Sequence, residues 1–250
     1  MDNIRIVMVE TTHPGNIGAA ARAMKNMGLQ SLSLVAPARF PCDQASVRAS
    51  GADDLLSAAS VHADLASAVA DCRIVIGASA RRRSVSWPLL TPGEAAPLAL
   101  RSAQTAPVAL VFGRESSGLS NAELDRCTHL LHIPTAPEFG SLNVAMAIQL
   151  VAYELRLAWL DAAEGAAQAP VEPPAADPPV ASNAEMEGLF AHLEQALDDI
   201  GFIDARRSDK LMRRLRRLFH RAAPDADEVN ILRGILSAAQ GRKSMRQPGD

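Results

Sequence analysis

Apolar and polar positions follow two different periods along the first 160 residues, and these periods predict a series of strands and helices. Short apolar runs without a polar face predict strands at residues 4–9, 32–35, 73–79, 108–112 and 129–133. Segments with apolar residues three or four positions apart predict helices at residues 16–27, 46–59, 64–72 and 94–101, and a short helix that begins at Ser120. Because strands and helices alternate along the chain, we expect an α/β domain with a mostly parallel sheet.

The longest helix of this part is predicted to follow the pair Gly140 and Ser141. Its apolar positions lie at helical spacing and are Val144, Ala147, Ile148, Val151 and Leu155. Ser141 is the predicted N-cap, because the first N–H groups of a helix have no partner within the helix. A loop of small residues in front of such N–H groups lets a ligand approach the backbone closely, although an ordinary capped helix has the same pattern.

The rest of the chain is predicted to contain a linker and three further helices. Residues 161–183 include thirteen Ala or Pro among 23 residues and show no periodic apolar face, which is typical of a semi-rigid linker. Amphipathic helices are predicted at residues 186–200, 209–222 and 227–240, before a polar tail. The expected regions are therefore an α/β domain at 1–160, the linker at 161–183 and a small all-helical module at 184–250.

Positive charge is concentrated in the second helix of this module. The net charge of the chain is only −3, yet residues 206–221 hold eight Lys or Arg against one Asp. The predicted apolar face of the helix consists of Leu211, Leu215, Leu218 and Ala222, and the opposite face of Lys210, Arg213, Arg214, Arg217 and Arg221. A solvated charged face is the ordinary explanation, whereas contact with the phosphates of an RNA is the functional one.

A second cationic run, Arg81, Arg82 and Arg83, follows the predicted strand at 73–79. Parallel sheets bind ligands at the carboxyl ends of their strands, and three predicted loops meet this condition. These loops are residues 77–83, 113–119 and 133–143. A solvated charge run again explains the arginines, but their place at a strand end favours contact with RNA.

Cysteine usage and hydropathy exclude several classes of protein. Cys42, Cys72 and Cys127 are odd in number and lack the spacing of a zinc site, so neither a disulfide framework nor a metal centre is expected. The first twenty residues carry charges instead of an apolar signal core, and the chain has no apolar run long enough to cross a bilayer. We expect a cytoplasmic protein without a membrane partner.

Three motifs at the predicted loops resemble those of the SPOUT methyltransferases, and most closely those of the TrmJ-type tRNA 2′-O-methyltransferases. The motifs are NIGAAAR at 16–22, VFGRESSGL at 111–119 and IPTAPEFGSLNVAMA at 133–147. GASARRRSVSWPLL, MRRLRRLFHRA and NILRGIL extend the resemblance over nearly the whole chain. It implies a C-terminal trefoil knot in the α/β domain, a homodimer, and S-adenosylmethionine bound without a metal. The implied reaction is 2′-O-methylation of cytidine or uridine at the first anticodon-loop nucleotide of tRNA, position 32.

Matching positions carry two sets of site residues over from this family. The residues expected to bind the cofactor are Ala78, Ser79, Ala80, Gly113, Ile133, Gly140, Ser141 and Leu142. The residues expected to act in catalysis are Arg22, Asn16, Arg114, Glu115, Ser141 and Asn143. Ser141 and Asn143 are expected to cap the long helix and to contact the ribose or the methionine moiety.

Arg22 is expected to be central to catalysis. A guanidinium has a pKa above about 12, so service as a neutral base is costly, and we expect Arg22 to stabilise the developing 2′-alkoxide or to hold the adjacent phosphate. Asn16 is expected to bind the ribose or to position Arg22. Glu115 is expected to orient Arg22 or a loop amide, and Arg114 to grip an RNA phosphate. A helix cap and a surface ion pair are the plainer explanations of these residues.

Three other functions compete with this one. A nicotinamide-dependent oxidoreductase would need a third glycine after Gly15 and Gly18 and an acidic residue at the end of the next strand, and both are missing. A catalytically silent RNA-binding protein would not need the complete set of polar motif residues. A SPOUT relative that acts on ribosomal RNA or on another tRNA position stays open.

Overall fold

The computed structural model describes residues 1–80, 88–166, 179–202 and 208–241 of the chain. The chain forms two compact units, Met1–Pro173 and Pro174–Asp250. Arg81, Arg82 and Arg83 lie outside the described residues, so their predicted contact with RNA stays a prediction. The trefoil knot that the resemblance implies also stays a prediction.

The first unit is built on one sheet with the strand order β3-β2-β1-β6-β4-β7-β5. Every pairing between these strands is parallel, which confirms the predicted sheet type. The strands are β1 (Ile4–Val9), β2 (Ser31–Val35), β3 (Ser60–His62), β4 (Ile74–Ala78), β5 (Leu89–Leu90), β6 (Val108–Phe112) and β7 (His129–Leu131).

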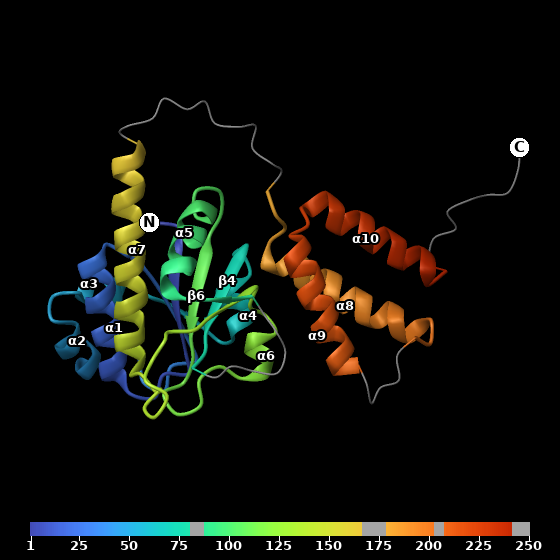
Figure 1. The fold of residues 1–250 in the computed structure, drawn as a ribbon. Coiled ribbons are helices and arrows are strands. Elements are labelled where there is room, and N and C mark those ends of the chain that lie inside the picture. Colours follow the sequence, from blue (N-terminus) through green and yellow to red (C-terminus); the bar gives the residue numbers. More distant parts are fainter. Residues whose placement is uncertain (81–87, 167–178, 203–207, 242–250) are drawn as a thin grey trace, which may run out of the picture. The chain divides into compact units, whose positions relative to one another are not determined.

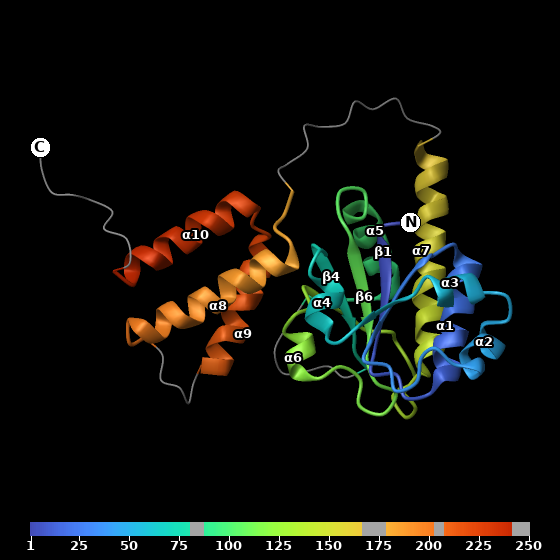
Figure 2. The ribbon, with the colours of Figure 1, turned by 180° about the vertical axis from the view of Figure 1, so that it is seen from behind.

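Helices cover both faces of the sheet (Figures 1 and 2). One face packs against α1 (Pro14–Met27), α2 (Asp43–Ala49), α3 (Asp53–Ser57), α5 (Pro92–Ser102) and α7 (Val144–Ala166), and the other against α4 (Leu65–Val69) and α6 (Asn121–Leu124). Alternate residues of β1 therefore enter different cores: Ile6 and Met8 pack on the α1 side, and Val7 and Val9 on the α4 side. Burial on both faces explains why the strands read as unbroken apolar runs.

The edges of the sheet depart from the prediction. Neither β3 nor β5 was predicted, because both are very short edge strands whose sequences show no periodicity and form only by pairing with β2 and β7. The single helical segment predicted at 46–59 is divided into α2 and α3. The division lies at Ser50 and Gly51, whose backbones adopt φ values of 46° and 92° and so end the first helix.

Within its described residues, 179–202 and 208–241, the second unit contains three helices, which confirms the predicted helices: α8 (Asn183–Asp199), α9 (Ser208–Ala222) and α10 (Ala226–Ala239). Their core contains Met186, Leu189, Phe190, Leu193, Met212 and Val229. The predicted apolar face of α9 is wrong at Leu218, which is 46% exposed, and at Ala222, which is also exposed, because the helix turns Met212 towards the core instead. Helix α7 ends at Ala166, six residues beyond the predicted boundary at 160, and the limits of the linker stay a prediction.

Candidate active site

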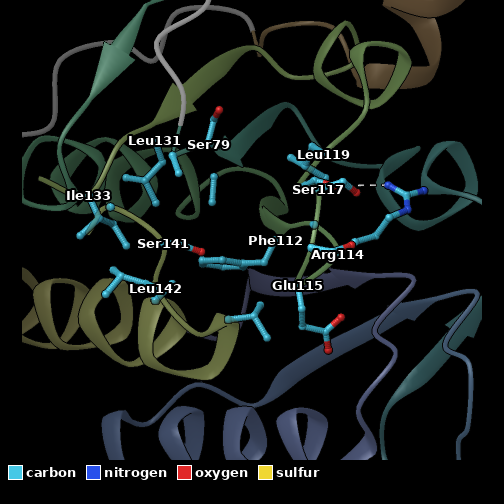
Figure 3. A pocket seen from close by; sticks show the side chains of 18 residues that line it. Ser79, Phe112, Arg114, Glu115, Ser117, Leu119, Leu131, Ile133, Ser141 and Leu142 are labelled. Carbon is cyan, nitrogen blue, oxygen red and sulfur yellow. Dashed lines mark hydrogen bonds between the residues drawn. The ribbon is translucent and has the colours of Figure 1, made fainter. Parts of the chain in front are cut away.

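A cavity of about 390 Å³ opens among the loops that follow β4, β6 and β7, beside the first turn of α7 (Figure 3). Its volume lies in the range of small-molecule sites. The predicted cofactor residues that line it are Ala78, Ser79, Ala80, Gly113, Ile133, Gly140, Ser141 and Leu142. The structure thus brings together all eight of them, from three segments far apart in the sequence. That they bind the cofactor is still a prediction.

The loop after β6 is folded so tightly that it requires glycine at Gly113. A Cβ atom built on Gly113 would lie 2.2 Å from the carbonyl carbon of Gly118, well inside van der Waals contact. Gly118 itself has a φ of 69°, which disfavours other residues. Arg114 and Gly118 form an antiparallel bridge that closes the turn between them. The shape of this wall of the cavity is therefore set by backbone contact.

The carboxylate of Glu115 binds the start of α1. Its Oε2 atom accepts hydrogen bonds from the backbone N–H of Thr12 at 3.1 Å and from the Thr12 hydroxyl at 3.0 Å. Its Oε1 atom accepts from the backbone N–H of His13 at 3.2 Å and from Asn16 Nδ2 at 2.9 Å. Glu115 thus satisfies free N–H groups at a helix start from a loop about a hundred residues away, where the helix dipole also favours negative charge.

These contacts keep Glu115 ionised. Burial raises the pKa of its carboxyl, but the hydrogen bonds from Asn16 and from the amides of Thr12 and His13 outweigh burial and lower the pKa to about 2. With two donors on each oxygen and such a low pKa, Glu115 is a poor base for a ribose hydroxyl. Its position fits the expectation that it orients loop amides.

Asn16 and Asn143 extend this network to the first turn of α7. Asn143 Nδ2 donates to Asn16 Oδ1 at 3.0 Å, and Asn16 donates in turn to Glu115. Asn143 Oδ1 also accepts from the backbone N–H of Ala145 at 2.9 Å, so Asn143 is the N-cap of α7. The predicted N-cap Ser141 is therefore wrong, since the helix begins two residues later; Ser141 lines the cavity instead.

Arg114 is held between two carboxylates. Its guanidinium forms ion pairs with Glu10 and Glu123, and it donates hydrogen bonds of 2.9 and 3.0 Å to the two carboxylate oxygens of Glu123. Hydrogen bonds to Glu123 and Glu10 raise the pKa of Arg114 above its ordinary range. In Figure 3 the side chain points away from the middle of the cavity, towards Gly118. The observed contacts show that Arg114 stabilises the loop after β6. Its contact with an RNA phosphate stays a prediction.

Arg22 stands apart from the cavity. It lies on the exposed side of α1 and does not belong to the residues that line the pocket of its own chain. Asn16, six positions earlier on the same helix, contacts Glu115 and Asn143 but has no bond to Arg22 among the described contacts. The catalytic role of Arg22 stays a prediction, and the structure does not join it to the Asn16 network.

Comparison with known proteins decides the family of the chain. The sequence model of the SpoU rRNA methylase family matches residues 3–153. This chain belongs to the SpoU methylase family. A second family model, described as the C-terminal domain of the tRNA methyltransferase TrmJ, matches residues 184–249 of the SpoU-family chain. The predicted methyltransferase of SPOUT type is thereby confirmed.

Individual relatives of this SpoU-family chain match it over nearly its whole length. The tRNA (cytidine/uridine/adenosine-2′-O-)-methyltransferase TrmJ of Pseudomonas aeruginosa is 50% identical, over 96% of this chain and 95% of that protein. The crystal structure of TrmJ from Z. mobilis ZM4 has a TM-score of 0.79 and 36% identity, over 94% of this chain and 97% of that one. The SpoU methyltransferase AviRb from Streptomyces viridochromogenes, solved with AdoMet, shares the fold, with a TM-score of 0.51 and 21% identity over 64% of this chain and 62% of that one.

Several residues of the SpoU-family site were not predicted from the sequence. Those that line the cavity are Phe112, Ser116, Ser117, Gly118, Leu119, Leu131, Val144 and Ala147. Phe112 and Leu131 are the last residues of strands β6 and β7. Because ligands bind at the carboxyl ends of parallel strands, the sequence did indicate that these two residues lie near the site. Thr12 and Glu10 reach Glu115 and Arg114 through contacts between distant segments, for which the sequence carries no signal. Glu123 lies only nine residues after Arg114, at the start of α6.

The second unit has a separate concave surface on α9. Arg214, Arg217, Leu218 and Arg221 line a cavity of about 370 Å³. The neighbouring Arg216 points to the other side, where it forms an ion pair with Glu187 and lies 4.4 Å over the Phe190 ring. Three of the five cations predicted to bind RNA therefore share one concavity, and this binding stays a prediction. In the described parts of the chain, no helix can cross a membrane and no group of side chains can hold a metal ion.

Proposed function

We propose that this chain transfers a methyl group from S-adenosylmethionine to the ribose 2′-OH of cytidine or uridine at position 32 of tRNA. The observation that carries the proposal is the cavity of about 390 Å³, which all eight residues expected to hold the cofactor line together. The names of the relatives support the reaction and the tRNA substrate. The cytoplasmic location expected from the sequence is part of the proposal.

The lining of the cavity fits S-adenosylmethionine. Backbone of small residues, at Ala78–Ala80 and Gly140–Leu142, forms two sides, and Gly113 leaves room where a Cβ atom would collide. Such walls offer N–H and C=O groups to an adenine ring and a ribose at close range. The cofactor supplies an activated methyl group when it is bound. The protein's own part is to fix the cavity walls, which the Glu115 and Arg114 contacts do, and to place the ribose.

A homodimer belongs to the proposal because α7 exposes a long apolar stripe. Met146, Leu150, Tyr153, Leu157 and Leu160 are all exposed, and their spacing of three or four residues places them on one face of the helix. Monomeric proteins rarely leave such a stripe in water. Helix α1, which carries the exposed Arg22, packs beside α7 in both ribbon views (Figures 1 and 2). A dimer through this face would bring Arg22 to the interface.

The reaction is tested by transfer from labelled S-adenosylmethionine to unmodified tRNA transcripts that carry C, U or A at position 32. Nuclease digestion locates the 2′-O-methyl group. We expect methylation at position 32, loss of turnover in Arg22→Ala, and little change in the cofactor Kd of that variant measured by calorimetry. Methylation at another tRNA position, or of a ribosomal RNA fragment instead of tRNA, would replace the proposed target. Loss of cofactor binding in Arg22→Ala would refute the role given to Arg22.

The dimer is tested at Leu150, in the middle of the stripe. Leu150→Glu places a charge in the proposed interface, so we expect a monomer in analytical ultracentrifugation and loss of methyl transfer. Val47→Glu is the matched control, because Val47 is 76% exposed on α2 and lies off the stripe. A wild-type chain that sediments as a monomer would contradict the proposed dimer.

A further inference from the structure

The loop between β7 and α7 presents an aromatic ring to solvent. Phe139 is 82% exposed, the largest exposed fraction among the large apolar side chains of the described residues. Aromatic residues are scarce in this protein, at 4% of the chain. An exposed phenyl ring keeps its apolar face free for a partner, and its place in the fold decides which partner can reach it.

The turn that carries Phe139 is held in place by hydrogen bonds. The backbone N–H of Phe139 donates to the carbonyl of Ala136 at 3.1 Å, and the Thr135 hydroxyl donates to the carbonyl of Gly140 at 3.4 Å. These bonds tie both sides of the turn, so the ring projects from a defined backbone. Phe139 is therefore exposed on a hydrogen-bonded turn.

The same turn forms the rim of the methyl-transfer cavity. Gly140, the next residue, lines the cavity together with Ser141 and Leu142. The nucleotide whose ribose enters this cavity has its base one glycosidic bond away, outside the small-residue walls. The Phe139 ring is an apolar flat surface attached to that rim, and nucleobases in RNA loops stack on such rings.

We propose that Phe139 is a positioning residue whose ring stacks on the base of the target nucleotide. This inference rests on the proposed function and adds a subsite to it. Stacking uses the π face that every base has, so the subsite fixes the base without reading its identity. It leaves the ribose to be placed by the cavity. The chemical class of ligand is a single unpaired nucleobase.

The test compares Phe139→Ala, Phe139→Leu and Phe139→Tyr in the full chain. Leucine keeps an apolar side chain but has no π face, whereas tyrosine keeps both the ring and its size. We expect the KM for tRNA to rise about 5- to 100-fold in the alanine and leucine variants and to stay within about twofold in the tyrosine variant. The kcat at saturating tRNA and the Kd for S-adenosylmethionine should change little in all three. Val47→Ala is the matched control, because Val47 is an apolar side chain on α2 that is 76% exposed.

A direct probe is an anticodon-loop hairpin with 2-aminopurine at the target position. We expect its fluorescence to fall on binding to the wild-type and tyrosine proteins and to fall less with the leucine variant, because stacking quenches this base. A leucine variant with wild-type KM and quenching would overturn the inference. A change in oligomeric state on Phe139→Ala would also overturn it, since the ring would then belong to a protein interface. If the wild-type chain methylates no tRNA, the proposed function itself fails, and this outcome differs from both.

Discussion

The two units use charged side chains in opposite ways. Around the cavity of the first unit, Arg114 forms ion pairs with Glu10 and Glu123, and Glu115 accepts four hydrogen bonds. These contacts hold the loops in place. On α9 of the second unit, Arg214 and Arg217 face an open concavity. A charge beside the cavity therefore stabilises the shape of its loops, whereas the charges of Arg214 and Arg217 face an open concavity that an anionic partner can enter.

Helix α9 contains both uses within two neighbouring residues. Arg216 pairs with Glu187 and covers Phe190, while Arg217 lines the concavity. One step along a helix rotates the side chain by about 100°, which is enough to move it from the core side to the solvent side. Residue type therefore says less about function than position on the helix does.

The largest effect is expected where a cavity wall allows no side chain at all. In Gly113→Ala the new Cβ atom would meet the backbone of Gly118 at 2.2 Å, and backbone cannot move aside cheaply. We expect cofactor binding to be abolished in calorimetry and the melting temperature to fall. Gly234→Ala on α10 is the matched control, because nothing lies within 4 Å of its Cβ position. That variant should be as stable as wild type or more stable by up to about 1 kcal/mol. Normal cofactor affinity in Gly113→Ala would contradict the claim that the cavity wall at Gly113 has no room for a side chain.

The next effect concerns the concavity on α9. We expect the double variant Arg214→Glu and Arg217→Glu to weaken tRNA binding by about 10- to 1,000-fold, with a flatter dependence of log Kd on log salt, because fewer counterions are released. Cofactor affinity should not change. The measurement is tRNA binding by fluorescence anisotropy at several salt concentrations.

Arg216→Met is the matched control for this comparison. It removes the ion pair with Glu187 and keeps an apolar chain over Phe190. It should lower the stability of the second unit while leaving the salt dependence of tRNA binding close to that of wild type. If the salt dependence of tRNA binding became flatter in Arg216→Met and stayed unchanged in the double variant, the roles assigned to the two sides of α9 would be reversed.

The smallest effect is the pH dependence that Glu115 adds to stability. Its folded pKa of about 2 lies below the usual value of about 4.3, so the ionised form is favoured by folding. The contribution is fully present above about pH 5 and is lost as pH falls towards 2. We expect Glu115→Gln to lower the free energy of unfolding at pH 7 by about 1–3 kcal/mol. In urea titrations the gap between wild type and variant should shrink below pH 5.

Glu94→Gln provides the control for this titration. Glu94 completes a capping box with Thr91 at the start of α5, and hydrogen bonds from Thr91 also lower its pKa. Its cap is local and lies outside the cavity lining, so cofactor affinity should be unchanged, whereas Glu115→Gln should weaken it. Equal cofactor affinity in the two variants would show that the cap on α1 does not shape the cavity.

The sequence by itself determined much of the fold and many of the residues that line the cavity. Apolar runs located β6 at Val108–Phe112 to the residue, and the helical period located α9 within one residue at its start. Local patterns suffice here because β6 is buried on both faces and reads as an unbroken apolar run, whereas α9 alternates apolar and charged residues at the helical period. The cavity residues from Ala78 to Leu142 follow from the resemblance of the three motifs to a known family.

Tertiary structure decided which polar groups meet. The cap of α7 at Asn143, the cap of α1 by Glu115 and the brace of Arg114 by Glu10 depend on loops that only the sheet brings together. The exposure of Leu218 depends on how α9 rolls against its neighbours. Sequence period fixes the face of an element, but the pairing of side chains a hundred residues apart is set by the packing of the whole unit.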